Sequence, residues 1–185
     1  MNETLETIRR RRSIRDFTSK QIQEEELQAI LKAGIYAPYG DRQSRMFTVI
    51  QNREMINRIN SEAKESAVSM GLPRMKQLGM QKDFNCFYGA PTAVIISGSR
   101  GFPGSVYDCS AAAQNMLLAA ESINIGSCWI HFSMFAFNAG TGKALMRDLA
   151  IPEDFEPFIS VSLGYKADNN TVIPQRDMTG VTYIR

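Results

Sequence analysis

Residues 106–125 read VYDCSAAAQNMLLAAESINI, an alanine-rich segment around which the rest of the chain must be arranged. Apolar residues cover almost its whole circumference, so we expect the longest helix of the chain, at its centre and with close neighbours. Gln114, Asn115 and Glu121 interrupt the apolar run, which is unlike a membrane span. Gly126 follows directly, and we expect it to end this helix as a C-terminal cap.

Strand and helix patterns alternate on both sides of this segment. Apolar spacing and turn residues mark each element. The expected strands are 47–50, 93–97 and 158–163, and the expected helices run from Gln23 to Ala37-Pro38, from Arg53 to Ser69 and from Thr141, as the cap, to Leu149. Helices outnumber strands and separate them, which indicates an α+β or α/β fold.

Two segments lack such a pattern. Residues 71–85 combine glycines, methionines and lysines, which suits a mobile cover better than a core element. The tail, residues 171–185, is expected to be extended. Its apolar residues have no later element to pack on, so we expect it to pack on another surface, such as a second subunit.

Composition excludes several classes of protein. A chain of 185 residues, 44% hydrophobic and 22% charged, fits one globular domain spanning residues 1–185. A net charge of +2 makes nucleic acid an unlikely partner. Three cysteines without metal-ligand spacing favour free thiols in a reducing compartment, with no disulfide and no metal. The start lacks a signal sequence, so we expect a cytoplasmic protein without a membrane segment.

A cluster of arginines follows a short amphipathic helix that begins near Asn2. Residues 11–15 read RRSIR, which places three guanidinium groups and a hydroxyl within five residues. Such donors can hold a phosphate bidentately while Ile14 points into the core. The alternative is that Arg9 to Arg12 form a solvated helix face or a nucleic-acid patch.

Four segments together resemble the FMN-dependent nitroreductase family. Residues 11–17, RRSIRDF, resemble its opening motif R-R-S-x-R-x-F. Residues 37–43, APYGDRQ, resemble its A-P-S-G-x-N-x-Q-P-W loop with one residue deleted, and residues 126–130, GSCWI, resemble its G-x-G-S-C-W-I run. Residues 157–165 end in LGY, as does the family's last core strand. The matches occur in the family's order, from about residue 9 to residue 176.

The resemblance implies a fold and an activity. The fold would be α+β, a three-layer α-β-α sandwich with a central, mostly antiparallel sheet and an extended, dimer-forming C-terminal tail. FMN would lie at the interface of a homodimer. NADH or NADPH would reduce it and leave, and a small electron-poor acceptor, such as a nitroaromatic or a quinone, would then take the electrons from the same pocket.

The resemblance also implies three groups of cofactor-binding residues. Those that contact the phosphate, the ribityl chain and the pyrimidine edge would be Arg11, Arg12, Ser13 and Arg15. Those that reach the flavin from the neighbouring subunit would be Pro38, Tyr39, Gly40 and Gln43. Those that pass over the ring and present a backbone N–H to its N5 would be Trp129, Ile130 and His131.

Several residues keep a second interpretation. Arg176 stands where the family places another phosphate-binding cation, but a solvated surface arginine is an equally good interpretation. Tyr39 replaces the usual serine, and Ser44-Arg45 replaces Pro-Trp, which leaves the polar contacts to the ring open. His131 is the only histidine and is expected to bind rather than to donate a proton. Cys128 is expected to be a small buried thiol.

Two other functions account for part of the sequence. Gly98, Gly101 and Gly104 follow a strand and precede a helix, as in an NAD-binding dehydrogenase. Their spacing, with Pro103 inside, differs from the dinucleotide fingerprint, so we expect a flexible loop. A non-enzymatic FMN-binding or storage protein would explain every matched motif, and turnover would separate it from an enzyme.

Overall fold

The central sheet is antiparallel throughout. The computed structural model describes residues 2–40, 45–168 and 172–185. Within these residues four strands form one sheet in the order β1-β2-β4-β3. The strands are β1 (Arg45–Ile50), β2 (Thr92–Ser99), β3 (Gly126–Ile130) and β4 (Phe155–Gly164). The predicted strands 47–50, 93–97 and 158–163 all lie inside these bounds.

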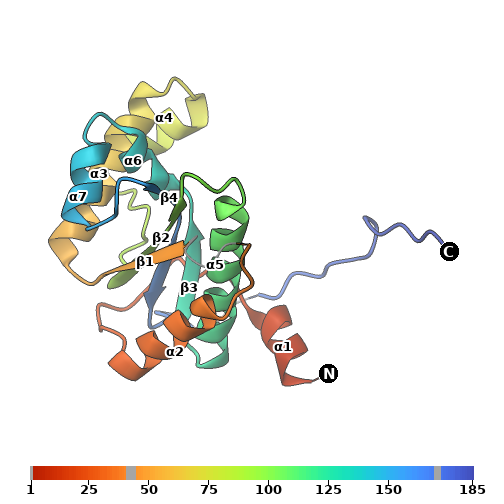
Figure 1. The fold of residues 1–185 in the computed structure, drawn as a ribbon. Helices are drawn as coiled ribbons and strands as arrows, with labels where there is room; N and C mark the ends of the chain where they lie inside the picture. The colour runs from red at the N-terminus through yellow and green to blue at the C-terminus, as the bar shows by residue number, and fades with distance from the viewer. Residues whose placement is uncertain (1, 41–44, 169–171) are drawn as a thin grey trace.

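Helices cover both faces of the sheet (Figure 1). They are α1 (Glu3–Arg10), α2 (Glu24–Ile35), α3 (Arg53–Ser69), α4 (Pro73–Met80), α5 (Ser105–Ser122), α6 (Phe135–Asn138) and α7 (Gly142–Asp148), with a 3-10 turn at Phe132–Met134. The helices predicted from Gln23, Arg53 and Thr141 are confirmed. Thr141 precedes α7, but its hydroxyl donates to Glu62 (2.9 Å) instead of capping the helix.

Alternation along β2 divides the interior into two cores. Ala93 and Ile95 belong to a core with α3, α6 and α7, while Val94 and Ile96 belong to a core with α2 and α5. These four residues are fully buried, because helices shield both faces of the sheet. The result is the expected α+β fold, in which the sheet forms the middle of three layers.

Helix α5 is the longest helix of the described residues and packs on β2, β3 and β4. It ends at Ser122, and Asn124 takes a left-handed conformation (φ 60°) two residues later. Gly126 is the first residue of β3. The prediction that Gly126 caps the helix is therefore wrong, because an asparagine, which tolerates this conformation, reverses the chain earlier.

The predicted flexible loop is wrong for Gly98, and residues 71–85, expected to form a mobile cover, contain a helix. Gly98 lies inside β2, where a Cβ would stand 2.6 Å from Ser105 Cβ, so this glycine allows α5 to approach the sheet. Residues 71–85 contain helix α4, which starts with Pro73 in its first turn and packs on α3. Gly79 permits that contact, since its Cβ would lie 2.6 Å from the Lys64 carbonyl oxygen. That this segment covers a site stays a prediction.

The C-terminal residues 172–185 form no helix or strand and extend away from the body, from a point beside α1 (Figure 1). Their side chains are exposed, including Val172 (86%) and Ile184 (97%). That the tail packs on a second subunit stays a prediction. No helix in the described part of the chain combines the length and apolar character that crossing a bilayer requires.

Candidate functional site

The arginine segment is held against the first residues of β3. After α1 ends at Arg10, the chain is extended, and the Ile14 N–H donates to the Ser127 carbonyl (2.9 Å). Ile14 is buried, as predicted, and clusters with Phe17, while Ser13 and Arg15 are exposed. Residues 11–15 therefore form a fixed row that directs its polar side chains outward, beside an edge strand.

The structure brings Arg11, Arg12 and Arg176 together. A cavity of about 510 Å³ lies between the end of α1 and the start of the tail, and its lining comprises Ile8, Arg9, Arg11, Arg12, Ile173, Pro174, Gln175 and Arg176. Burial lowers the pKa of Arg11, and the neighbouring charges of Arg12 and Arg176 lower it further. Positive charge is thus concentrated at this cavity by residues that lie far apart in the sequence.

Neighbouring arginines differ in their partners. Arg9 pairs with Glu6 (2.6 Å) and Arg10 approaches Glu121 (3.8 Å), so carboxylates already neutralise both. The guanidinium of Arg12 turns back to the carbonyls of Arg9 and Arg10 at the end of α1. In the described residues Arg11, Arg12 and Arg176 form no ion pair. Their charge remains available for an anion.

A buried ion pair supports this cluster from below. Lys166 Nζ lies 3.0 Å from Glu121 at the end of α5, and both side chains are about nine-tenths buried. Glu121 also faces Arg10, so one carboxylate connects α5, α1 and the chain after β4. Removing one partner of this pair would leave an unpaired buried charge, which is costly. The pair therefore fixes how α1, α5 and the chain after β4 lie around the cluster.

Cys128 lies behind the same row and is buried, as expected (2% exposed). Burial raises the pKa of Cys128, whereas Arg15 and a hydrogen bond with Ser13 act in the opposite direction. Arg15 itself lies over the ring of Tyr88, 5.6 Å from its centroid. These contacts show that residues 13, 15 and 128 share one small region.

The other residues predicted on β3 divide between surface and core. Trp129 (36% exposed) lies on the opposite face of the strand from the buried Ile130. His131 is exposed at the end of the strand, beside Phe135 (6.4 Å between ring centroids). Only Trp129 and His131 therefore offer side chains to a ligand, while Ile130 could contribute its backbone.

The predicted loop Pro38–Gly40 lies far from the arginine cluster in space. The Gly40 N–H donates to the Asp108 carboxylate (3.0 Å) in the first turn of α5, whereas Glu121 and the arginines lie at its last turn. At about 1.5 Å per residue, the two ends are roughly 20 Å apart. One copy therefore does not bring Gly40 to its own arginine cluster. Gln43 lies outside the described residues.

Sequence reasoning overlooked two residues beside this loop. Asp108 is a buried carboxylate (8% exposed) inside an otherwise apolar helix, and that contrast was a readable signal. Arg45 was noted only as a departure from a motif. It donates hydrogen bonds to several backbone carbonyls around the loop, an arrangement with no pattern in the sequence.

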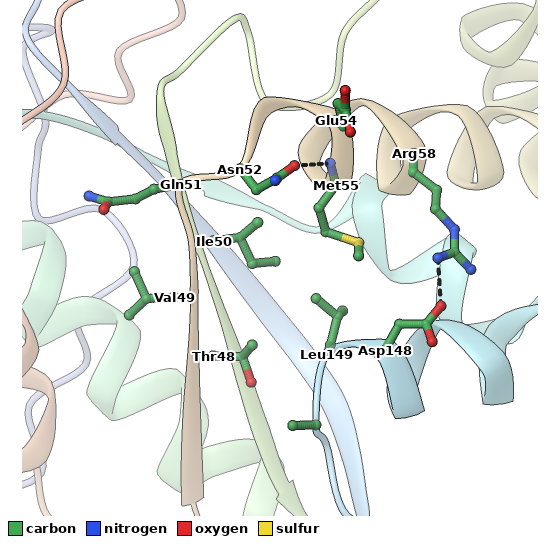
Figure 2. A pocket seen from close by; sticks show the side chains of 11 residues that line it. Thr48, Val49, Ile50, Gln51, Asn52, Glu54, Met55, Arg58, Asp148 and Leu149 are labelled. Atoms are coloured by element: carbon green, nitrogen blue, oxygen red, sulfur yellow. Dashed lines mark hydrogen bonds and ion pairs between the residues drawn. The ribbon is translucent and has the colours of Figure 1, made fainter.

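A separate cavity of about 580 Å³ borders the outer edge of β1 (Figure 2). Its charged side chains include Arg58 and Asp148, which pair with each other (2.6 Å) across α3 and α7. Asn52 caps α3 through the Met55 N–H. Arg58 and Asp148 neutralise each other, so this cavity does not gather several like charges as the arginine cluster does.

Comparisons with known proteins find relatives that match most or all of the chain. A model of the nitroreductase family matches residues 8–165. A nitroreductase from Bacteroides fragilis with bound FMN is 34% identical, with a TM-score of 0.92 over all of both chains. A protein of Methanothermobacter thermautotrophicus, provisionally named NADH dehydrogenase/NAD(P)H nitroreductase, is 34% identical over 90% of this chain and 79% of its own. The NADPH-flavin oxidoreductase of Vibrio harveyi is 29% identical over 95% of this chain and 70% of its own.

Proposed function

Since this chain belongs to the nitroreductase family, we propose that it is an FMN-dependent oxidoreductase that takes electrons from NADH or NADPH. It would pass them, in a ping-pong sequence, to a small electron-poor acceptor such as a nitroaromatic or a quinone. The single observation that carries the proposal is the set of uncompensated arginines at the cavity beside α1.

These arginines fit the phosphate of FMN. Arg11, Arg12 and Arg176 lack ion pairs in the described residues and border a cavity of about 510 Å³. Burial lowers the pKa of Arg11, and repulsion from Arg12 and Arg176 lowers it further. A phosphate dianion would relieve this repulsion through charge-assisted hydrogen bonds. We assign the phosphate to these three residues.

The row after Arg12 supplies the next contacts. Ser13 and Arg15 point outward beside β3, so they suit the ribityl chain and the polar edge of the ring. Trp129 and Ile130 at the end of the same strand, with His131 directly after it, would orient the flavin through their backbone. When bound, FMN supplies the electron-transfer chemistry, while the chain binds it, orients it and excludes water.

We further propose a homodimer in which the loop Pro38–Gly40 of one copy meets the flavin of the other. The loop and the arginine cluster lie at opposite ends of α5, roughly 20 Å apart by helix length. The exposed tail and the half-exposed Leu5 and Ile8 of α1 supply an apolar surface for the second copy. Both observations support a shared site.

The alternatives have less support. An NAD-binding loop at Gly98, Gly101 and Gly104 is disfavoured because Gly98 packs inside β2 against α5. A flavin-binding protein without turnover would use the same arginines, so only a kinetic measurement separates it from an enzyme. The named reductases among the relatives favour the enzyme.

The absorption spectrum of the purified protein tests the proposal. We expect a yellow protein with about one FMN per chain, which loses its colour in anaerobic titration with NADH or NADPH and regains it on addition of a quinone. A bound flavin that stays oxidised in excess nicotinamide would favour the binding protein instead. Colourless protein that refuses added FMN would contradict both.

Arg12→Ala tests the phosphate assignment. We expect at least a tenfold weaker affinity for FMN, because a charge-assisted pair is lost, with a shallower dependence of binding on salt. Arg74→Ala, an exposed arginine in α4, is the matched control and should retain the flavin. Full FMN occupancy in the Arg12 variant at low FMN concentration would refute the assignment.

A further inference from the structure

We infer that Arg45, the first residue of β1, is a positioning residue that holds residues 36–40 in the form that meets the flavin of a second copy. This inference rests on the proposed function. The proposed function is extended by Arg45, which does not touch the cofactor. Arg45 acts through the loop, together with Asp108 on α5.

Arg45 satisfies the end of α2. Its Nη2 donates to the carbonyls of Ile35 (3.3 Å) and Ala37 (3.0 Å), and its Nη1 to those of Pro38 and Asp108 (3.4 Å each). The last carbonyls of a helix lack partners within it and carry partial negative charge. One guanidinium therefore supplies a donor to the last residue of α2 and connects the loop to the start of α5.

Asp108 holds the other end of the loop. Both of its carboxylate oxygens accept from the Gly40 N–H (3.1 and 3.0 Å), and the side chain is buried. The ring of Phe102 packs against Gly40, since a Cβ on Gly40 would stand 2.6 Å from Phe102 Cζ. The loop is thus fixed at both ends by charged groups, with close packing between them.

The residues between these anchors are held outward. Tyr36 is 85% exposed and Tyr39 is 50% exposed, although Arg45 lies over the Tyr39 ring, 5.3 Å from its centroid. Arg45 and Asp108 thus hold the loop without burying Tyr36 or Tyr39, and both rings are presented to another surface. Because the chain's own arginine cluster lies at the far end of α5, that surface belongs to a second copy.

The variants Arg45→Met and Arg45→Lys measure how much the hydrogen bonds from Arg45 contribute to FMN binding in the dimer. We expect Arg45→Met to weaken FMN binding about tenfold and to change the quenching of bound flavin fluorescence. Arg45→Lys should recover part of both effects, because an ammonium still donates to one or two carbonyls. Thermal melting checks that both variants are folded.

Arg53→Met is the matched control. Arg53 also donates to a loop carbonyl, that of Gly89 (3.2 Å), at the start of α3. We expect an unchanged FMN affinity in this variant. Equal losses of affinity in the Arg45 and Arg53 variants would show a general effect on stability and would overturn the inference.

Mixed dimers decide on which flavin Arg45 acts. One dimer combines an Arg12→Ala chain with an Arg45→Met chain; the other combines a chain carrying both substitutions with a wild-type chain. If Arg45 serves the other copy, the first dimer keeps one FMN of wild-type affinity and the second keeps none. The reverse pattern, or equal occupancy in the two dimers, overturns the inference. A wild-type dimer without FMN would instead refute the proposed function.

Discussion

At the residue scale, four consecutive arginines have different surroundings. Arg9 and Arg10 have carboxylate partners on α1 and α5, whereas Arg11 and Arg12 have none in the described residues. A run of like charges reads as one feature in the sequence, but the direction of each side chain depends on where α1 ends. Because the chain becomes extended at Arg11, the last two arginines face the tail.

The buried thiols predict a loss of stability in alkali. Burial raises the pKa of Cys86 to about 12 and that of Cys109 to about 12, from a reference of 9.0. The unfolded chain therefore releases these protons first. The stabilisation is complete below pH 9 and is lost as the pH rises toward 12. We expect each thiol to contribute a fall of about 1.4 kcal/mol in unfolding free energy between pH 8 and 10.

Denaturant titration at both pH values measures this fall. The double variant Cys86→Ala with Cys109→Ala should lose less stability over the same interval, although it is less stable at pH 8 because of the cavities it creates. Native protein should also resist thiol reagents at pH 8. An equal fall in wild type and variant would assign the pH effect to other groups.

At the element scale, small residues determine how closely helices approach their neighbours. Gly98 on β2 allows α5 to approach the sheet closely, and Gly79 on α4 allows the close approach of α3. Sequence patterns describe each element alone, so they assigned both glycines to flexible segments. The structure shows the reverse, since both glycines lie at close contacts between elements.

Gly98→Ala should therefore destabilise the protein by about 1–3 kcal/mol, because overpacking displaces α5 from the sheet. Its Cβ would lie 2.9 Å from the ring of Phe158 as well as against Ser105. Gly140→Ala is the matched control, since no heavy atom lies within 4 Å of its Cβ position. Denaturant midpoints compare the two, and similar values would show that the contact at Gly98 relaxes freely.

Helix α4 depends on one lysine of α3. Lys64 Nζ donates to the carbonyls of Gln81 (2.6 Å), Lys82 (3.3 Å) and Phe84 (3.1 Å) just after the helix. We expect Lys64→Met to speed hydrogen exchange in α4 at least about tenfold, because hydrogen bonds to a charged group are lost. Lys76→Met, exposed on α4, should leave the exchange unchanged. Protection that is equal in both variants would contradict a role for Lys64.

At the scale of the whole molecule, one copy leaves much apolar surface uncovered. Half-exposed Leu5 and Ile8 lie on α1, and the tail exposes Val172, Tyr183 and Ile184. Exposed apolar side chains at both ends of the chain support the proposed dimer, in which a second copy would cover them. Residues 173–176 of the tail border the arginine cluster, and we propose that the exposed residues after them pack on a second copy.

Deleting residues 172–185 should convert the dimer to monomer and abolish FMN binding, because Arg176 is lost as well. Deleting only residues 177–185 keeps Arg176 but removes Val181, Tyr183 and Ile184. We expect a weaker dimer in this case, with FMN occupancy that falls in parallel with dimer mass. Sedimentation with absorbance detection measures both quantities. A fully dimeric, yellow protein after the longer deletion would refute the dependence.

Sequence alone determined the local features of this protein, because they depend on neighbouring residues. The amphipathic helices, the doubly buried β2, the extended tail and the phosphate-suited RRSIR row follow from periodicity and charge. Only the tertiary structure placed Arg176 beside Arg11 and set Pro38–Gly40 at the other end of α5. Those contacts join residues distant in the chain, and the lengths of helices and the packing of glycines decide them.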